Sequence, residues 1–219
     1  MPGDLPDRNH ACSAIRAVIL DYGEVISQPP DPAAIAAMAQ IFGLAADRFR
    51  SFYGTLRYEY DRGDLSANQY WASIASAAGL ELSARHVEQL REIDVAMWSR
   101  VNPSVLRWAG QLRSAGLKTA VLSNMHDDMV QKIREDPTWA ERFDCLTLSS
   151  AIRMAKPDAA IFRHCLKCLD VAPGEALFVD DREVNVRAAR ELGIKGIVAN
   201  STAELRRQLE DIGFRPLPE

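Results

Sequence analysis

Short apolar segments alternate with longer amphipathic segments along most of this chain. Five of the apolar segments are rich in aliphatic and β-branched residues, which is typical of buried strands: 17–20, 118–124, 145–150, 175–181 and 193–200. Segments with the apolar spacing of helices lie between the later strands: 127–135, 159–169, 183–192 and 202–212. Another helix is expected before 118, because Asn102 is a good N-cap, Pro103 suits the first turn and Gly116 suits the end. Strands alternating with helices from residue 103 onward predict an α/β fold with a parallel sheet.

The segment between the first strand and residue 100 has a different pattern. It contains no convincing strand, and four helices are expected there: 32–41, 47–62, 66–78 and 83–97. Val87, Leu90, Ile93 and Met97 form one apolar stripe on the last of them. The chain therefore predicts an all-helical block inserted into the α/β domain after its first strand.

Composition and charge exclude several classes of protein. The chain has 219 residues, of which 47% are hydrophobic and 26% are charged, and this balance is typical of a globular protein. The net charge of −4 and the lack of a long Lys/Arg run argue against a nucleic-acid-binding protein. No apolar run approaches the ~18 residues of a membrane span. Residues 1–12 are expected to be a loose tail rather than a signal peptide, so we predict a soluble, cytoplasmic protein.

The four cysteines are expected to be free thiols in a cytoplasmic protein. They are Cys12, Cys145, Cys165 and Cys168. The last two form a C-x-x-C pattern, but a zinc site needs further ligands, and no second pair of this kind is present.

Polar residues stand at the ends of three predicted strands. Asp21 follows the first strand, Ser123 and Asn124 end the second, and Asp180 and Asp181 end the fourth. In an open parallel sheet, ligands bind beyond the carboxyl ends of the strands, so these side chains are expected to share one crevice.

Lys156 lies in the loop after the third strand and is expected at the same edge. Three crowded carboxylates repel one another unless a cation neutralises them, and Mg²⁺ prefers such oxygen ligands. A metal site beside a lysine and a hydroxyl suits a phosphoryl group attacked by a carboxylate. Taken singly, each residue also has an ordinary explanation as a turn, a helix cap or a surface charge.

Four short sequences in the chain resemble the motifs of the haloacid dehalogenase superfamily of hydrolases. "VILDYGEV" resembles the first motif, "KTAVLSN" the second, "AKPD" the third and "LFVDDREVN" the fourth. The resemblance covers nearly all of 15–212 and implies a Rossmann-like parallel sheet core over 13–28 and 101–219. It also implies that 29–100 is a helical cap. "DRGDLSANQYW" (61–71) is similar to a cap segment of the branch that contains the epoxide hydrolase phosphatase domain and a glucose-1-phosphate phosphatase.

The resemblance assigns the phosphoryl-handling roles to four residues. Asp21 would be the nucleophile, and Ser123 with the backbone of Asn124 would hold phosphate oxygens. Lys156 would bridge the nucleophile and the phosphate.

The resemblance also implies a Mg²⁺ site. Asp21, the carbonyl of Gly23 and Asp181 would be ligands, and Asp180 would bind directly or through water. Asn185 would orient the ligands without touching the metal. One departure matters here: related phosphatases carry a second Asp, a general acid and base, at the position of Gly23.

The predicted function is a Mg²⁺-dependent phosphatase acting on a small phosphorylated metabolite of the sugar phosphate class through an aspartyl-phosphate. Two alternatives stay open: a 2-haloacid dehalogenase, in which Asp21 attacks carbon, and a weakly active or non-catalytic relative. Substrate specificity is expected to come from the cap, and its polar and aromatic candidates could equally be cap core: Tyr53, Tyr58, Tyr60, Arg62 and Trp71. The sequence leaves the substrate and the oligomeric state open.

Overall fold

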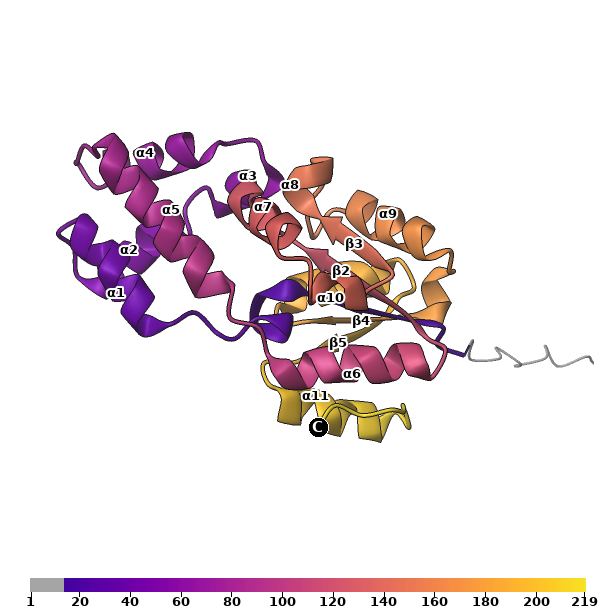
Figure 1. Ribbon diagram of the computed structural model, residues 1–219. Helices are drawn as coiled ribbons and strands as arrows, with labels where there is room; N and C mark the ends of the chain where they lie inside the picture. Colours follow the sequence, from indigo (N-terminus) through magenta and orange to yellow (C-terminus); the bar gives the residue numbers. More distant parts are fainter. Residues whose placement is uncertain (1–13) are drawn as a thin grey trace, which may run out of the picture.

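A five-stranded parallel sheet forms the centre of the protein (Figure 1). The computed structural model describes residues 14–219, so the predicted tail and Cys12 lie outside the described residues. The strands are β1 (Ala17–Leu20), β2 (Lys118–Ser123), β3 (Cys145–Leu148), β4 (Ala176–Asp180) and β5 (Lys195–Val198). Their order in the sheet is β3-β2-β1-β4-β5, with every neighbouring pair parallel. The α/β prediction is confirmed, and β1 lies in the middle of the sheet.

Both faces of the sheet are covered by helices. Side chains alternate along a strand, so Val18 and Leu20 of β1 pack on one face while Ala17 and Ile19 pack on the other. The first face is covered by α6 (Pro103–Ser114), α7 (Asp127–Glu135) and α11 (Thr202–Asp211). The second face is covered by α9 (Ala159–Leu169) and α10 (Glu183–Glu191). The residues of β1 have no exposed surface, as expected for the central strand of a parallel sheet.

The inserted segment forms five helices with a hydrophobic core of their own. They are α1 (Pro32–Ile41), α2 (Ala46–Tyr53), α3 (Arg57–Arg62), α4 (Ala67–Ala77) and α5 (Ala84–Trp98), and we call them the helical block. The single helix predicted over 47–62 is wrong, because the chain breaks between α2 and α3. Leu56 has a positive φ there, and the Tyr70 hydroxyl donates to the Tyr53 carbonyl that a continuous helix would use.

The helical block is joined to the sheet domain by two chain segments that lie side by side. Ser27 forms an antiparallel bridge with Val101. Next to this bridge, Gln28 N–H donates to the Arg100 carbonyl (2.6 Å), and Asn102 N–H donates to the Ile26 carbonyl (2.7 Å).

Side chains also fasten the helical block to the sheet domain. Arg91 of α5 donates two hydrogen bonds to Asp128 of α7 (2.9 and 2.8 Å). Tyr58 of α3 donates to Asp158 (2.9 Å), which precedes α9. The predicted strand 145–150 ends early, because Ser149–Ile152 form the short helix α8, which packs against α3.

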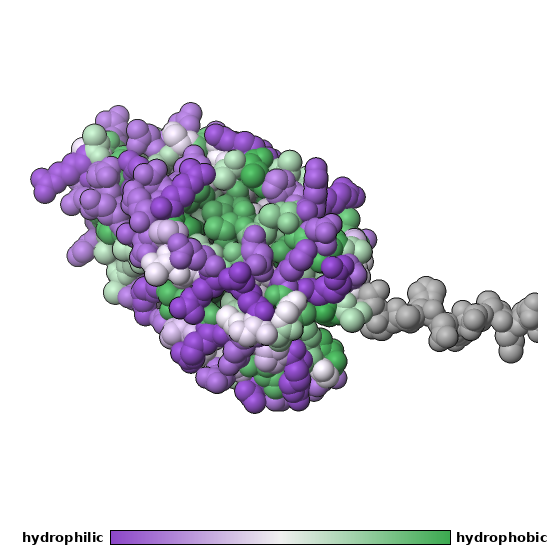
Figure 2. All heavy atoms as spheres, turned by 45° about the vertical axis from the view of Figure 1, so that its right-hand side comes forward, coloured by the Kyte–Doolittle hydropathy of each residue, from purple (hydrophilic) through white to green (hydrophobic). Residues whose placement is uncertain are grey.

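The described surface is mixed in polarity. Figure 2 shows hydrophilic residues over most of the visible face, with apolar residues between them near its centre. Within 14–219, every helix is too short or too polar to cross a bilayer.

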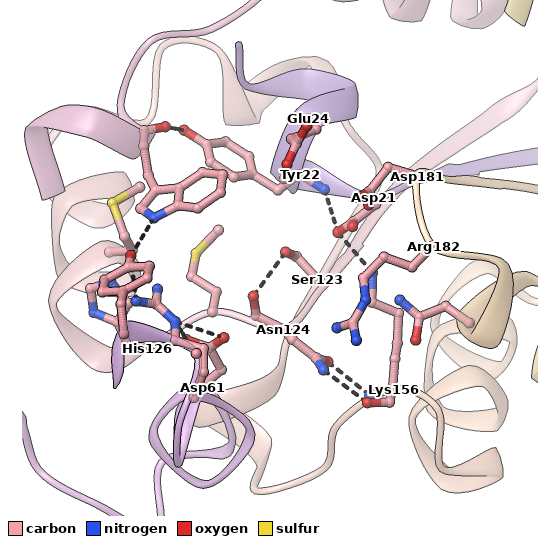
Figure 3. Close-up of a pocket in the computed structure, with 18 residues that line it drawn as sticks. Asp21, Tyr22, Glu24, Asp61, Ser123, Asn124, His126, Lys156, Asp181 and Arg182 are labelled. Atoms are coloured by element: carbon pink, nitrogen blue, oxygen red, sulfur yellow. Dashed lines mark hydrogen bonds and ion pairs between the residues drawn. The ribbon is translucent and has the colours of Figure 1, made fainter. Parts of the chain in front are cut away.

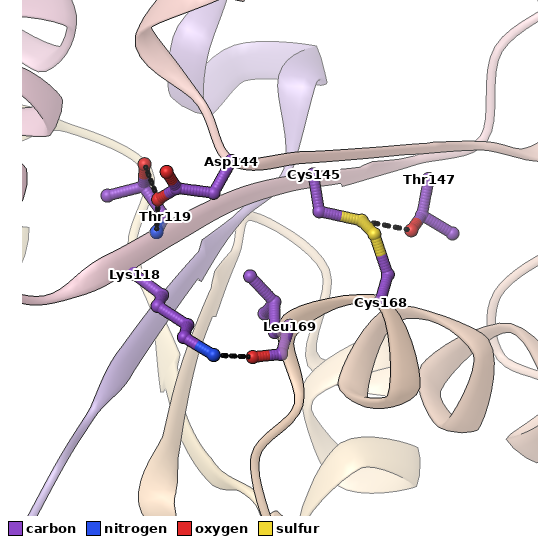
Figure 4. The surroundings of a disulfide bond; sticks show 7 residues. All are labelled: Lys118, Thr119, Asp144, Cys145, Thr147, Cys168 and Leu169. Atoms are coloured by element: carbon purple, nitrogen blue, oxygen red, sulfur yellow. Dashed lines mark hydrogen bonds between the residues drawn. A yellow bond between two sulfur atoms is a disulfide. The ribbon is translucent and has the colours of Figure 1, made fainter.

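The prediction of free thiols is wrong for two cysteines, since Cys145 and Cys168 form a disulfide (Figure 4). Packing of α9 on β3 brings their Cα atoms to 6.2 Å, a separation that a disulfide can bridge. Cys165 stays a free, buried thiol, and burial raises its pKa to about 12. The C-x-x-C cysteines therefore do not act as a pair.

Candidate functional site

Three strands deliver their polar ends to one edge of the sheet. Asp21 follows β1, Ser123 is the last residue of β2, and Asp180 is the last residue of β4. The Asp21 N–H donates to the Val179 carbonyl (2.9 Å), which continues the β1–β4 pairing up to the carboxylate. Figure 3 shows these side chains around one pocket.

The sequence-predicted carboxylates and lysine lie together at this edge. One oxygen from each of Asp21, Asp180 and Asp181 lies within 4.8 Å of the others. Lys156 Nζ lies 2.7 Å from Asp21 Oδ1 and 2.6 Å from Asp180 Oδ2. Because the lysine side chain has only 1% of its surface exposed, this charge is committed to the two carboxylates.

Burial dominates the ionisation of the cluster. It raises the pKa of Asp21 to about 7, where Lys156 opposes the shift and repulsion by Asp180 adds to it. Burial likewise raises the pKa of Asp181 to about 6, with Asp180 as the next cause. Burial acts to lower the pKa of Lys156, but Asp21 and Asp180 outweigh it and raise that pKa. When all three carboxylates are ionised, Lys156 balances one charge and two negative charges stay uncompensated.

The Asn124 side chain positions Lys156. Its Oδ1 accepts from the Lys156 N–H (2.7 Å), and its Nδ2 donates to the Lys156 carbonyl (2.8 Å). This two-point clamp between the β2 end and the loop after α8 holds the lysine backbone against the cluster. The sequence predicted only a backbone role for Asn124.

Asp180 and Asp181 have different surroundings. Asp180 has no exposed surface and accepts from Lys156, from the Arg182 N–H (2.8 Å) and from Asn185 Nδ2, which lies 3.0 Å from both oxygens. Asp181 is partly exposed and lines the cavity. Asp181 is therefore the carboxylate that is freer to bind a ligand, whereas Asp180 is committed to contacts within the protein.

The donor set fits a hard divalent cation. Oxygen ligands carrying excess negative charge are what Mg²⁺ binds. The buried Asn185 Oδ1 has no hydrogen-bond partner within 14–219, so it could accept from a metal-bound water.

Gly23 lines the same cavity, and its backbone conformation does not require glycine. Its φ of −61° and ψ of 127° are open to any residue. A Cβ at this position would lie 3.8 Å from Trp98 Cζ3 and 3.9 Å from Asp21 Oδ2, which are ordinary contacts. The indole of Trp98 thus lies beside the position where related phosphatases carry the second Asp.

The cavity extends from the carboxylates to the helical block and has a volume of about 210 Å³. Of the five candidates for specificity, Tyr53 lines it. The others are used elsewhere: Tyr60 and Trp71 pack in the core of the helical block, Tyr58 contacts Asp158, and Arg62 contacts Asp64. Other residues that line the cavity were not predicted from the sequence: Tyr22, Arg57, Asp61, Trp98, Met125 and His126. Tyr22 lies inside the first motif, Asp61 begins the cap segment 61–71, and Met125 and His126 follow the second motif, so only Arg57 and Trp98 lacked a signal nearby.

Comparison with known proteins shows which family this chain matches. The model of the haloacid dehalogenase-like hydrolases matches residues 14–193. The D-ribitol-5-phosphate phosphatase of Bacteroides thetaiotaomicron is 27% identical over 218 residues, covering 89% of this chain and 97% of that protein. The (S)-2-haloacid dehalogenase 1 of Pseudomonas sp. (strain CBS-3) is 24% identical over 219 residues, covering 92% and 95%. Five other curated relatives are larger, and the chain spans between 11% and 37% of their lengths.

Solved structures agree on the fold. A Bacteroides thetaiotaomicron enzyme of this family, solved in complex with magnesium and inorganic phosphate, superimposes with a TM-score of 0.69 at 21% identity. The match covers 84% of this chain and 94% of that one. With the family model covering most of the chain and the sheet edge carrying its motif residues, the protein belongs to the haloacid dehalogenase-like hydrolases.

Proposed function

We propose that this hydrolase is a Mg²⁺-dependent phosphatase that acts on a small phosphorylated metabolite of the sugar phosphate class. The observation that carries the proposal is the cluster of Asp21, Asp180 and Asp181 oxygens within 4.8 Å, with Lys156 in contact with two of them. Asp21, Asp181 and the Gly23 carbonyl would hold the cation. Bound there, Mg²⁺ would supply positive charge to the transferring phosphoryl group.

The chain's own residues support a two-step transfer. In the first step the Asp21 carboxylate attacks phosphorus, a P–O bond to Asp21 forms, and the bond to the leaving alcohol breaks. Lys156 is placed to hold Asp21 ionised and to stabilise charge on the phosphoryl oxygens. In the second step water attacks the aspartyl-phosphate, which releases inorganic phosphate and restores Asp21.

Glycine at position 23 separates this chain from phosphatases that use a second Asp as acid and base. Without that Asp, water or the substrate itself must protonate the leaving alcohol. We expect slower turnover because no positioned general acid assists this step. This glycine is also the feature that favours a weakly active relative over a fast enzyme.

The dehalogenase alternative is weaker on electrostatic grounds. Attack on carbon needs no cation, and a site without one has no use for two further carboxylates beside the nucleophile. The similarity to D-ribitol-5-phosphate phosphatase supports the phosphoryl reaction. Because the chain is also similar to (S)-2-haloacid dehalogenase 1, the experiment below tests dehalogenation too.

Chelation separates the alternatives. The protein is assayed on a panel of phosphorylated sugars, polyols, nucleotides and amino acids, and on 2-chloropropionate, with excess EDTA or with Mg²⁺. We expect phosphate release only with Mg²⁺, together with an acid-stable phospho-enzyme in quenched samples. Halide release in EDTA would identify a dehalogenase, and inactivity toward every substrate would favour the non-catalytic relative.

A further inference from the structure

The end of the cavity remote from the carboxylates is lined by a second polar cluster. Arg57 and Asp61 of α3 and His126 of the loop after β2 form its wall. Figure 3 labels Asp61 and His126. Asp61 and His126 lie across the pocket from Asp21 and Asp181, with Ser123 and Asn124 between them. A molecule whose phosphoryl group lies at Asp21 would therefore extend its other end toward this cluster.

The cluster is fixed by contacts between the helical block and the sheet domain. Arg57 Nε contacts both oxygens of Asp61 (3.0 and 3.1 Å), and Arg57 Nη1 contacts Asp94 Oδ2 (3.2 Å). The Ser149 hydroxyl donates to the Asp61 carbonyl, which holds α3 on α8. The His126 ring stacks on Tyr60 of α3, with centroids 4.6 Å apart. These groups are thus preorganised rather than mobile surface side chains.

This cluster has hydrogen-bonding capacity that is not used within 14–219. His126 has 1% of its side chain exposed, and its Nε2 lies 3.3 Å from Asp94 Oδ2. Neither ring nitrogen makes a hydrogen bond in the part of the chain that the structure describes, so His126 keeps unused hydrogen-bonding capacity at the cavity wall. Asp61 is also buried, and a single N–H of Arg57 leaves acceptor capacity on its carboxylate.

From this geometry we infer a hydroxyl-recognition subsite formed by His126 and Asp61 and held by Arg57, so that the preferred substrate is the monophosphate of a polyol or sugar. This inference rests on the proposed function and assigns the residues that bind the leaving group of the substrate. A hydroxyl can donate to or accept from these unpaired atoms, and its carbon chain would lie against the apolar wall at Trp98, Met125 and Met129.

Three other substrate classes compete with a hydroxylated one for this end. An alkyl or isoprenyl chain would bury the acceptors without partners, which disfavours binding about tenfold or more for each lost hydrogen bond. A second phosphate would meet two carboxylates, Asp61 and Asp94, against the single guanidinium of Arg57. An ammonium group would lie beside that guanidinium, but the same two carboxylates would attract it, so 5-aminopentyl phosphate is the most demanding competitor of the hydroxylated probe.

Binding to matched five-carbon phosphates tests the inference. The probes are ribitol 5-phosphate, n-pentyl phosphate, 5-aminopentyl phosphate and pentane-1,5-diyl bisphosphate. Affinities are measured by calorimetry in Mg²⁺ with full-length Asp21→Asn, and kcat and KM are measured with the wild-type protein. We expect ribitol 5-phosphate to bind at least about tenfold more tightly than each other probe, with the preference expressed mainly in KM. Tighter or equal binding of any other probe overturns the inference.

Substitutions of His126 test whether this residue causes the preference for ribitol 5-phosphate over n-pentyl phosphate. His126→Phe keeps the ring stack but removes both nitrogens, and it should cut the ribitol-to-pentyl ratio about tenfold. His126→Asn retains a polar atom near the Nδ1 position and should recover part of that ratio. Tyr60→Phe is the matched control, since the buried Tyr60 hydroxyl faces no partner and Tyr60 is outside the cavity lining. Melting temperatures identify any variant that fails to fold.

Failure of the subsite and failure of the proposed phosphatase function give different results. An unchanged ratio in folded His126→Phe overturns the subsite even if the protein is an active phosphatase. If wild-type protein releases no phosphate from any probe or from p-nitrophenyl phosphate, the proposed function fails. The calorimetric order of the four probes still decides the subsite in that case.

Discussion

Asp21 combines deep burial with a titratable carboxylate. It is almost wholly buried at the end of the central strand, and its surroundings raise its pKa to about 7. A residue needed only for the turn would not require a carboxylate, since Asn forms the same turns. In this structure the carboxylate accepts from the Tyr22 N–H (2.6 Å) and from Lys156, so one oxygen is oriented while the cluster stays compact.

The first prediction at this scale concerns Asp21→Asn. The amide keeps the size of the side chain but neither attacks phosphorus well nor ligates Mg²⁺ well, so we expect phosphate release to fall about a thousandfold or more. Steady-state phosphate release and circular dichroism measure activity and folding together. A folded variant with wild-type turnover would contradict the nucleophile role, while Gln131→Ala, on the exposed side of α7, serves as a control for handling losses.

At the scale of elements, two contacts between distant segments organise the protein. The clamp from Asn124 to the Lys156 backbone joins the end of β2 to the loop before α9, and the disulfide joins β3 to α9. The clamp holds the loop that carries Lys156 against the strands, whereas the disulfide fixes the far end of α9 at the start of β3. Disulfides are uncommon in the cytosol, where most thiols are kept reduced, so the cytoplasmic location stays a prediction.

A prediction about the disulfide follows from its loop size. The two cysteines are 23 residues apart, so the bridge should stabilise the fold by about 3 kcal/mol in the chain-entropy description. We expect reductant, or Cys168→Ser, to lower the melting temperature by about 6–12 °C. Reductant should leave the melting temperature of Cys168→Ser unchanged, which is the internal control.

Thiol counting provides a direct readout of the same bridge. The sequence has four cysteines, so alkylation under denaturing conditions should modify two thiols without reductant and four with it. Four modified thiols in protein purified under oxidising conditions would show that the bridge does not form.

For the whole molecule, ionisation of the carboxylate cluster makes the free energy of unfolding depend on pH and on bound metal. The pKa values of Asp21 and Asp181 lie above their ordinary value of 3.8, at about 7 and about 6. Between pH 4 and pH 7 the folded protein therefore holds protons that the unfolded chain has released. Stability must fall as pH rises through this window. Asp94 acts in the opposite sense: Arg57 and His126 outweigh its burial and lower its pKa, so its stabilisation is lost only when the pH falls below about 4.

The prediction at this scale is a pH-dependent melting temperature that Mg²⁺ corrects. In EDTA we expect a decrease of about 5 °C between pH 4.5 and pH 7.5, which corresponds to about 2 kcal/mol. Mg²⁺ binds the ionised carboxylates, so it should raise the melting temperature most at the upper end of the range. Differential scanning calorimetry measures both effects. Asp21→Asn should flatten the slope in EDTA, and a melting temperature that rises across this window in EDTA would contradict the assignment.

The sequence by itself determined the sheet and the residues at its edge. Strand and helix periodicity are local properties, and parallel strands joined by crossover helices must end on the same side. The positions of Asp21, Ser123 and Asp180 at one edge therefore followed from chain order alone. The helical nature of 30–100 followed in the same way from apolar spacing, although the break at Leu56 did not, because it depends on a hydroxyl contributed by Tyr70 of another helix.

Only the tertiary structure decided what surrounds that edge. Arg57, Asp61, Trp98 and His126 meet at the cavity because the helical block docks on the sheet domain at one orientation, and no local pattern encodes that orientation. The Cys145–Cys168 bridge likewise depends on how α9 packs on β3. The physical reason is the separation along the sequence of the residues that are in contact. Periodicity and motif spacing depend on residues that are near one another in the chain. Burial, pKa values and the far wall of the cavity depend on contacts between segments that are distant in sequence.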